Sequence, residues 1–185
     1  MAERGGPVLG YLLVEDREGV FEGAALVVDT RGIPLDFRYT EPVRPTRLER
    51  ILYGSALDVY LREDVLLKNL VESVEAKPTL WILRDRDLIR AARRHAKVAA
   101  VCLESTSASP LDQVGILEPQ GDRTTFLLQA DPISAPFRLA VTEDQLSQTQ
   151  KISADLVAAA EEMELGEPFS RMGKALESIR EHEPL

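Results

Sequence analysis

The sequence predicts an α/β protein built around one mixed sheet, and four apolar stretches carry this prediction. Residues 8–14 and 24–28 are apolar at nearly every position, which is typical of strands buried on both faces. Residues 80–83 and 98–103 show the same pattern, and a predicted helix lies between them. A strand, a helix and a second buried strand indicate a parallel crossover. We therefore expect antiparallel and parallel pairing in the same sheet.

A hairpin turn follows the second apolar stretch. Asp29 suits the first turn position, and Gly32 can take the positive φ that closes a short hairpin. Large apolar residues then alternate with other residues at the period of a half-buried strand; they are Ile33, Leu35, Phe37 and Tyr39. Pro34 cannot donate a ladder hydrogen bond, so this strand belongs at the sheet edge. Residues 8–14 and 21–40 are thus predicted to form three antiparallel strands.

Helix signals begin after this strand. Thr46 and Glu49 have the spacing of a capping box, and Gly54 and Ser55 are expected to divide the helix that follows into two. A further helix is predicted from residue 86 to about 97.

Four units follow from these signals. We expect an α/β domain over residues 1–104, a linker over 105–112, a small β unit over 113–141 and a C-terminal helical pair over 142–185. The alternative is that all four form a single compact domain.

Composition restricts the class of protein. The net charge is −9: residues 31–100 carry 14 basic and 10 acidic groups, whereas residues 101–185 carry 6 and 15. An acidic chain disfavours sequence-independent binding to nucleic acid. No apolar run approaches the roughly 20 residues of a membrane helix. Cys102 is the single cysteine, which excludes an intramolecular disulfide and favours a reducing cytoplasm.

The predicted order, three strands followed by helix, strand, helix and strand, is similar to that of the ribonuclease H-like fold, an analogy of element order alone. In that fold the first and fourth strands are parallel neighbours. Acids just beyond their ends, here Glu15 or Asp16 and Asp85, are then expected to converge, with Glu49 as the third. Such carboxylates can hold two Mg²⁺ or Mn²⁺ ions, with Asp16 and Asp85 as the metal ligands.

Each of these acids also has an ordinary structural role open to it. Glu49 belongs to the predicted capping box, and Glu15 and Asp16 lie in a charged turn. Asp85 precedes a helix and can serve as its N-cap.

A basic stripe is the second candidate surface. Five basic residues share one face of the predicted helix, and Arg84 precedes them; they are Arg86, Arg90, Arg93, Arg94 and Lys97. The stripe suits a polyanion or an acidic protein partner. The acidic run from Glu161 to Glu167 is one such partner, within the chain or in a second copy. The alternative is a solvated face, and no aromatic residues interleave to stack on bases.

No serine-hydrolase, zincin or phosphate-loop motif occurs. We therefore expect a non-enzymatic interaction or assembly subunit of a larger cytoplasmic complex, without a cofactor. Its partner would be a protein or a second copy, with nucleic acid less favoured. The alternative is a ribonuclease H-like metal-dependent nuclease or phosphoryl-transfer enzyme that uses the clustered carboxylates with Mg²⁺ or Mn²⁺.

Overall fold

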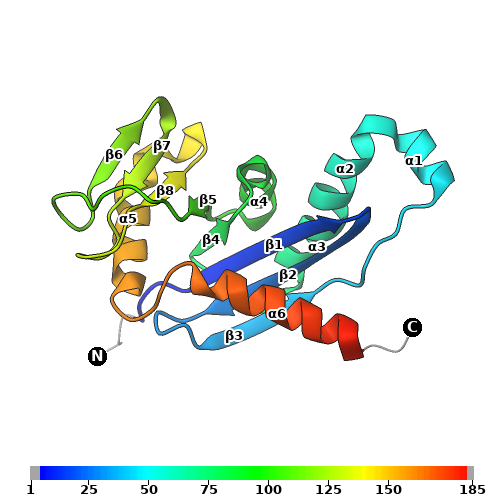
Figure 1. Ribbon diagram of the computed structural model, residues 1–185, viewed down its shortest axis with the longest axis horizontal. Helices are drawn as coiled ribbons and strands as arrows, with labels where there is room; N and C mark the ends of the chain where they lie inside the picture. The colour runs from blue at the N-terminus through cyan, green and yellow to red at the C-terminus, as the bar shows by residue number, and fades with distance from the viewer. Residues whose placement is uncertain (1–4, 183–185) are drawn as a thin grey trace.

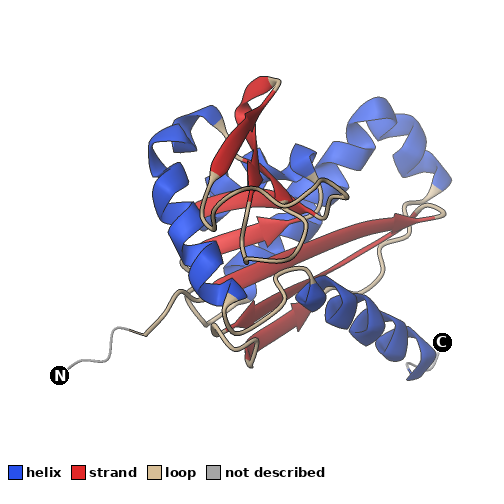
Figure 2. Cartoon of the chain, turned by 60° about the vertical axis from the view of Figure 1, so that its left-hand side comes forward, coloured by secondary structure: helices blue, strands red, loops and turns tan. Residues whose placement is uncertain are grey.

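The fold is a mixed eight-stranded sheet with helices on both faces (Figure 1, Figure 2). A computed structural model describes residues 5–182. The spatial order of the strands is β3-β2-β1-β4-β5-β8-β7-β6. Their bounds are β1 Leu9–Arg17, β2 Val20–Val28, β3 Pro34–Tyr39, β4 Leu80–Leu83, β5 Ala99–Glu104, β6 Leu117–Gln120, β7 Asp122–Leu128 and β8 Phe137–Ala140.

The predicted antiparallel meander is confirmed. β1 pairs with β2 and β2 pairs with β3, both antiparallel, and β3 lies at the sheet edge as Pro34 indicated. Gly32 has a φ of 77°, and its N–H donates to the carbonyl oxygen of Asp29 at 2.9 Å. The local sequence therefore determines where this hairpin turns.

The predicted parallel crossover is also confirmed. β4 runs parallel to both β1 and β5. β8 then pairs antiparallel with β5, and β7 and β6 continue from it. The strands of the predicted small β unit therefore belong to the same sheet as residues 1–104.

The helices fall into two groups. An unbroken helical run follows β3, and its parts are α1 (Arg47–Tyr53), η1 (Gly54–Ala56), α2 (Leu57–Val59), the π-helical η2 (Tyr60–Leu67) and α3 (Lys68–Ser73). The later helices are η3 (Arg86–Leu88), α4 (Ile89–Ala96), η4 (Glu143–Gln148), α5 (Thr149–Ala160) and α6 (Glu167–His182). The predicted interruption at Gly54 is present as a change of helix type. Within the described part of the chain, no helix is long and apolar enough to cross a membrane.

Side chains alternate between the two faces of the sheet along each strand, and this creates one apolar core on each face. On one face, Tyr11 and Leu13 of β1 pack with α5 and α6. On the other face, Leu12 packs with α3, α4 and Trp81 of β4. Successive strand residues point to opposite faces, so a position along β1 or β4 decides which helices a side chain meets.

Polar contacts fix α6 on the first face. The Tyr11 hydroxyl donates to the carbonyl oxygen of Leu165 at 2.8 Å, just before α6 begins. Burial raises the pKa of Tyr11, so the hydroxyl keeps its proton. Farther along the helix, Arg171 donates to the carbonyl oxygen of Gly32 at 2.7 Å, and Arg180 forms an ion pair with the buried Glu22.

Gln145 completes the pairing of β5. Its side-chain oxygen accepts from the N–H of Ala100 at 2.9 Å, and its amide nitrogen donates to the carbonyl oxygen of Ala100 at 2.8 Å. The fully buried amide thus acts as a strand neighbour where β8 has ended.

Candidate functional site

Two of the predicted carboxylates, Glu15 on β1 and Asp85 just after β4, point in different directions. Glu15 shares the face of Leu13, toward α6, and pairs with Arg17 at 3.0 Å. Asp85 lies two residues after Leu83, which faces the opposite core, and it forms an ion pair with Arg62 of η2. Its other oxygen accepts from the N–H of Asp87 at 2.9 Å and caps η3. Glu15 and Asp85 therefore lie on opposite faces of the sheet.

The other two predicted acids stabilise local structure. Asp16 accepts from the N–H of Gly19 at 2.8 Å, within the β1–β2 turn. Glu49 accepts from the N–H of Thr46 at 2.7 Å and completes the capping box at the start of α1. Among residues 5–182, no three histidine, cysteine or acidic side chains come together in a group that could hold a metal ion. The four acids therefore do not fit the predicted two-metal site.

The predicted basic stripe is largely paired within the chain. Its partners lie on three different elements: Arg86 pairs with Asp122 at 3.3 Å, Arg93 with Asp144 at 3.2 Å and Arg94 with Glu63 at 3.3 Å. None of these partners belongs to the acidic run from Glu161 to Glu167. In the described part of the chain, Arg90 and Lys97 form no ion pair, so they are the stripe charges most available to an external anion.

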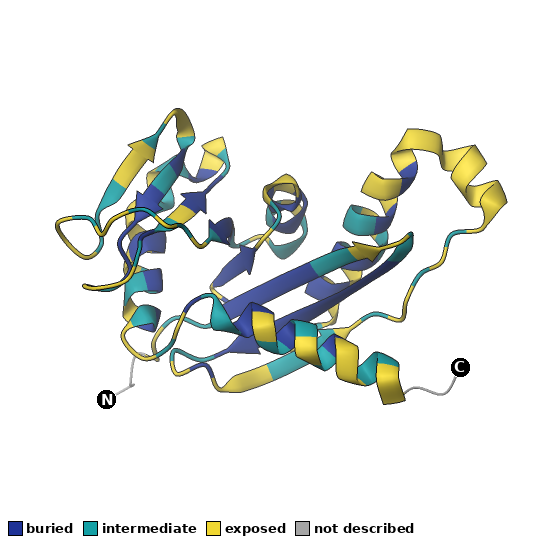
Figure 3. Ribbon diagram, viewed as in Figure 1, coloured by how far each residue is buried: buried dark blue, intermediate teal, exposed yellow. Residues whose placement is uncertain are grey.

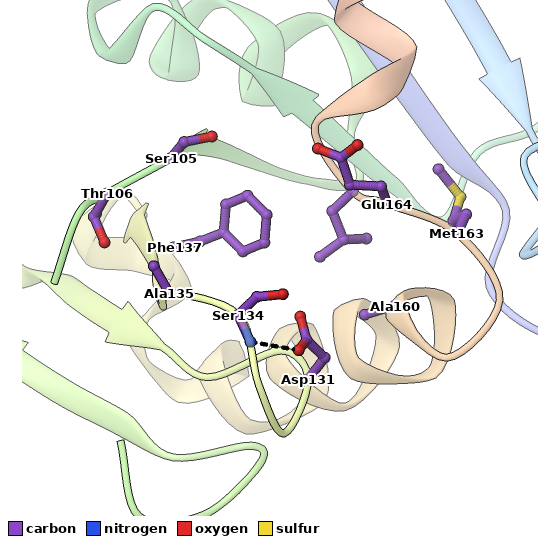
Figure 4. A pocket seen from close by; sticks show the side chains of 10 residues that line it. Ser105, Thr106, Asp131, Ser134, Ala135, Phe137, Ala160, Met163 and Glu164 are labelled. Carbon is purple, nitrogen blue, oxygen red and sulfur yellow. Dashed lines mark hydrogen bonds between the residues drawn. The ribbon is translucent and has the colours of Figure 1, made fainter. Parts of the chain in front are cut away.

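A cavity lies at the carboxyl ends of β4 and β5. Its volume is about 500 Å³, and its walls include Arg84 after β4, Glu104 at the end of β5 and Phe169 in α6. The carboxyl ends of parallel strands are the usual ligand position in open α/β sheets. A second cavity of about 270 Å³ adjoins the first and shares Ser105, Phe137 and Glu164 with it (Figure 4).

Within the described range, Arg84 is the one basic residue that lines the joined cavities, beside the acids Glu104, Asp131, Glu164 and Glu167. The Arg84 guanidinium lies over the Phe169 ring, 5.0 Å from its centre, so a cation–π contact positions it at the cavity wall. Glu164 forms no ion pair among the residues that the structure describes, whereas Glu104 and Glu167 pair with Arg138 at 3.3 Å and with Arg171 at 2.7 Å. Figure 4 shows the Glu164 carboxylate on the side of the cavity that carries Ser105.

From the sequence, we grouped Arg84 with the basic stripe as a candidate for anion binding and did not select Glu104 or Glu164. Glu104 directly follows the buried strand at 98–103, so the rule about strand ends that selected Asp85 also applied to it. Glu164 was seen only as a member of an acidic run. Nothing local in the sequence shows that the turn between α5 and α6 returns to the strand ends.

Comparison with known proteins identifies the fold. No protein-family model matches the sequence, and no curated protein is similar to it. Among solved structures, endonuclease V from Bacillus subtilis is similar over 80% of this chain and 70% of that chain, with 13% identity and a TM-score of 0.52. Endonuclease V from Streptomyces avermitilis is similar over 80% and 72%, with 13% identity and a TM-score of 0.52.

A third similar structure contains nucleic acid. Endonuclease V from Ciona intestinalis, in complex with a DNA that contains an inosine, is similar over 96% of this chain and 87% of that chain. The identity is 10% and the TM-score is 0.54. These comparisons confirm the predicted ribonuclease H-like α/β fold.

The same structures correct the functional expectation. We expected a non-enzymatic interaction or assembly subunit, because no catalytic motif was found. The similar folds are those of a nuclease, and they favour the alternative of a ribonuclease H-like nuclease. One of these structures holds DNA, whereas we disfavoured a nucleic-acid partner for this chain on net charge.

Proposed function

We propose that this protein acts on nucleic acid as a nuclease of the ribonuclease H-like fold, with its site at the joined cavities beside β4 and β5. The observation that supports this proposal best is the sheet that it shares with three endonuclease V structures, combined with a cavity at the carboxyl edge of its parallel strands. The stripe on α4 is a less suitable site, because three of its arginines are already paired.

The cavity residues offer suitable chemistry for a nucleotide. Arg84 can pair with a phosphate, and its place over Phe169 limits the freedom it would lose on binding. Phe137 offers a ring against which a base can stack. Glu164 provides a carboxylate able to accept a proton from an attacking water molecule. The hydroxyl of Ser105 can contact a phosphate or a sugar.

The charges predict weak dependence of binding on salt. A site with one available cation neutralises about one phosphate. A plot of the logarithm of the binding constant against the logarithm of the salt concentration should therefore have a slope of about −0.7 for a single strand. A protein that follows a long stretch of backbone would give a slope several times steeper. We therefore propose recognition of one or two nucleotides, as the small cavity also suggests.

Cleavage of end-labelled single- and double-stranded DNA and RNA, with Mg²⁺, Mn²⁺ or a chelator, tests the proposal. Glu164→Gln should lower the rate by about 10²–10⁴-fold, the usual contribution of a positioned base, and Arg84→Ala should weaken binding. Glu161→Gln is the matched control, because Glu161 is exposed and outside the lining of both cavities. Absence of both cleavage and binding would refute the proposal, as would cleavage that survives both site variants.

A further inference from the structure

A third cavity lies beside α4 and shares no lining residue with the joined cavities. Its volume is about 190 Å³, which is less than the roughly 300–1,000 Å³ of pockets for drug-sized ligands. Its walls include Arg86 of η3, Arg90 of α4, Thr124 of β7 and Glu143 of η4, and none of its lining residues is aromatic. The cavity therefore suits a small polar ligand that is recognised by its charge.

Two arginines meet at this cavity. Arg86 and Arg90 stand at positions i and i+4 of the helical segment formed by η3 and α4, and both line the cavity. Side chains at this spacing are neighbours on a helix surface, and two like charges there destabilise the helix. Figure 3 shows α4 with a buried side and an exposed side, and Arg90 is an exposed residue. An anion between the two guanidinium groups would offset their repulsion.

Thr124 fixes the position of Arg86. The Nη2 atom of Arg86 donates to the hydroxyl oxygen of Thr124 at 3.0 Å and to a carboxylate oxygen of Asp122 at 3.3 Å. Both contacts use the same nitrogen of a guanidinium group that carries five N–H donors. In the part of the chain that the structure describes, Nε and Nη1 of Arg86 have no hydrogen-bond partner. Arg86 is therefore anchored through one nitrogen and keeps its other N–H groups for a second anion.

Arg90 supplies a second guanidinium group that the fold does not use. Among residues 5–182 it forms no ion pair, whereas Arg93 and Arg94 of the same helix pair with Asp144 and Glu63. A planar guanidinium group matches the oxygens of a phosphate and can donate two parallel hydrogen bonds to them. Two such groups at a small cavity without an aromatic wall indicate recognition of a phosphate rather than of a base.

Two acids near the cavity limit how tightly an anion can bind. Asp122 already accepts from the N–H of Thr124 at 2.8 Å and from the hydroxyl of Thr125 at 3.0 Å, so its charge is held on β7. Glu143 lines the cavity itself, so the walls carry two positive charges and one negative charge. We therefore expect weak binding that becomes tighter when Glu143 is neutralised.

We propose that Arg86 and Arg90 together hold one phosphate group in this cavity, with Thr124 as the residue that positions Arg86. The ligand is inorganic phosphate or a phosphomonoester. Such a phosphate carries about 1.5–2 negative charges at pH 7, whereas a phosphate within a nucleic-acid strand carries one, so two arginines favour the free or terminal group. The site is separate from the proposed nuclease site and requires no cleavage.

Calorimetric titration of the full chain with inorganic phosphate, at a fixed low ionic strength set with chloride, tests the proposal. Arg90→Gln should weaken phosphate binding roughly tenfold or more, because a hydrogen bond to a charged group is lost. Glu143→Gln should tighten binding about two- to fivefold, the effect of an exposed charge. Lys97→Gln is the matched control, because Lys97 is an exposed cation at the end of the same helix and lies outside the lining. It should leave binding unchanged.

Substitution of Thr124 tests the positioning of Arg86. Thr124→Val removes the hydroxyl that anchors the guanidinium group and should weaken phosphate binding while Arg90 remains intact. Thr124→Ser keeps a hydroxyl and should restore binding. Melting curves confirm that each variant folds. If Thr124→Val binds phosphate as tightly as the wild type, the positioning role is overturned.

Competition experiments identify the source of the phosphate. A nucleoside 5′-monophosphate should displace inorganic phosphate, whereas the nucleoside alone should not. An oligonucleotide without a terminal phosphate that competes better than the monophosphate would overturn the assignment in favour of a phosphate within a strand. No phosphate binding by the wild type, or an equal loss in Lys97→Gln and Arg90→Gln, would overturn the site itself. Phosphate binding that depends on Arg90 in a protein without nuclease activity would support this inference and refute only the proposed function.

Discussion

Substitution of Asp85 separates a structural role from a metal-binding one. The side chain caps η3 through the N–H of Asp87 at 2.9 Å and forms an ion pair with Arg62. Asp85→Ala removes both interactions, whereas Asp85→Asn keeps an oxygen for the cap and removes the charge. The two variants should therefore differ in stability in a defined order, with Ala lower than Asn and Asn slightly lower than the wild type.

The expected losses of stability follow from the two interactions of Asp85 and from the exposure of its side chain. Loss of an N-cap costs about 1 kcal/mol. The ion pair contributes about 0.2–1 kcal/mol, because the Asp85 side chain is 36% exposed and water screens the attraction. Arg62 also keeps a contact with Asp58 at 3.6 Å, which reduces the cost further. We expect unfolding free energies lower by about 1.5 kcal/mol for Ala and about 0.5 kcal/mol for Asn, or about 3–6 °C and 1–2 °C in melting temperature.

Thermal unfolding followed by circular dichroism, with and without Mn²⁺, measures both effects. Any effect of Mn²⁺ on melting should be the same in the wild type and in Asp85→Asn, because the carboxylate is already paired. Asp87→Asn is the control at a neighbouring exposed acid. If Mn²⁺ raises the melting temperature of the wild type and Asp85→Asn abolishes that rise without any loss of stability, the structural reasoning is refuted and Asp85 is a metal ligand.

Three further predictions concern stability and reactivity. Gln145→Ala should cost about 2–5 kcal/mol in chemical denaturation, because it leaves the N–H and carbonyl groups of Ala100 buried without partners; a cost below about 1 kcal/mol would contradict that role. Burial raises the pKa of Cys102 to about 12, so a thiol reagent near neutral pH should modify it only after unfolding. Hydrogen bonds from the Thr124 N–H and Thr125 lower the pKa of Asp122 from 3.8 to about 2. The stabilisation that this gives is present above pH 3.8 and is lost as the pH falls toward 2, so Asp122→Asn should flatten the acid limb of unfolding curves.

The fold was largely predictable because its signals are local. Unbroken apolar stretches identified β1, β2, β4 and β5, and Gly32 identified the hairpin turn. The pairing of β5 with β8 was not predictable in the same way. Those strands are separated by more than 30 residues, and the stretch after Glu104 has the composition of a linker. Composition shows that a segment is irregular, but it does not show whether the chain returns to the same sheet.

The candidate site was harder to predict, because the register between β1 and β4 decides which of their side chains share a face of the sheet. The rule that acids gather at strand ends selected Asp85 together with Glu15 or Asp16. The pairing of Leu12 with Leu83 places Glu15 and Asp85 on opposite faces. Asp16 lies on the same face as Leu12, but its carboxylate accepts a hydrogen bond within the β1–β2 turn. The sequence contains the acids and the strands, whereas the relative position of two distant strands comes from packing of the whole core.

Helix α6 joins the stability of the fold to the geometry of the site. Glu164 precedes Leu165, whose buried backbone carbonyl accepts the Tyr11 hydroxyl from the middle of β1. Arg84 is held at the cavity wall by Phe169, the third residue of α6, whose ring also packs edge-on against Tyr11 with ring centres 5.2 Å apart. The two charged groups that we assign to substrate therefore both depend on Tyr11, Glu164 through the hydrogen bond at Leu165 and Arg84 through Phe169. A functional group held by packed neighbours keeps its geometry before substrate binds, which a loop alone would not ensure. Loosening of α6 should consequently impair phosphate binding and proton transfer together.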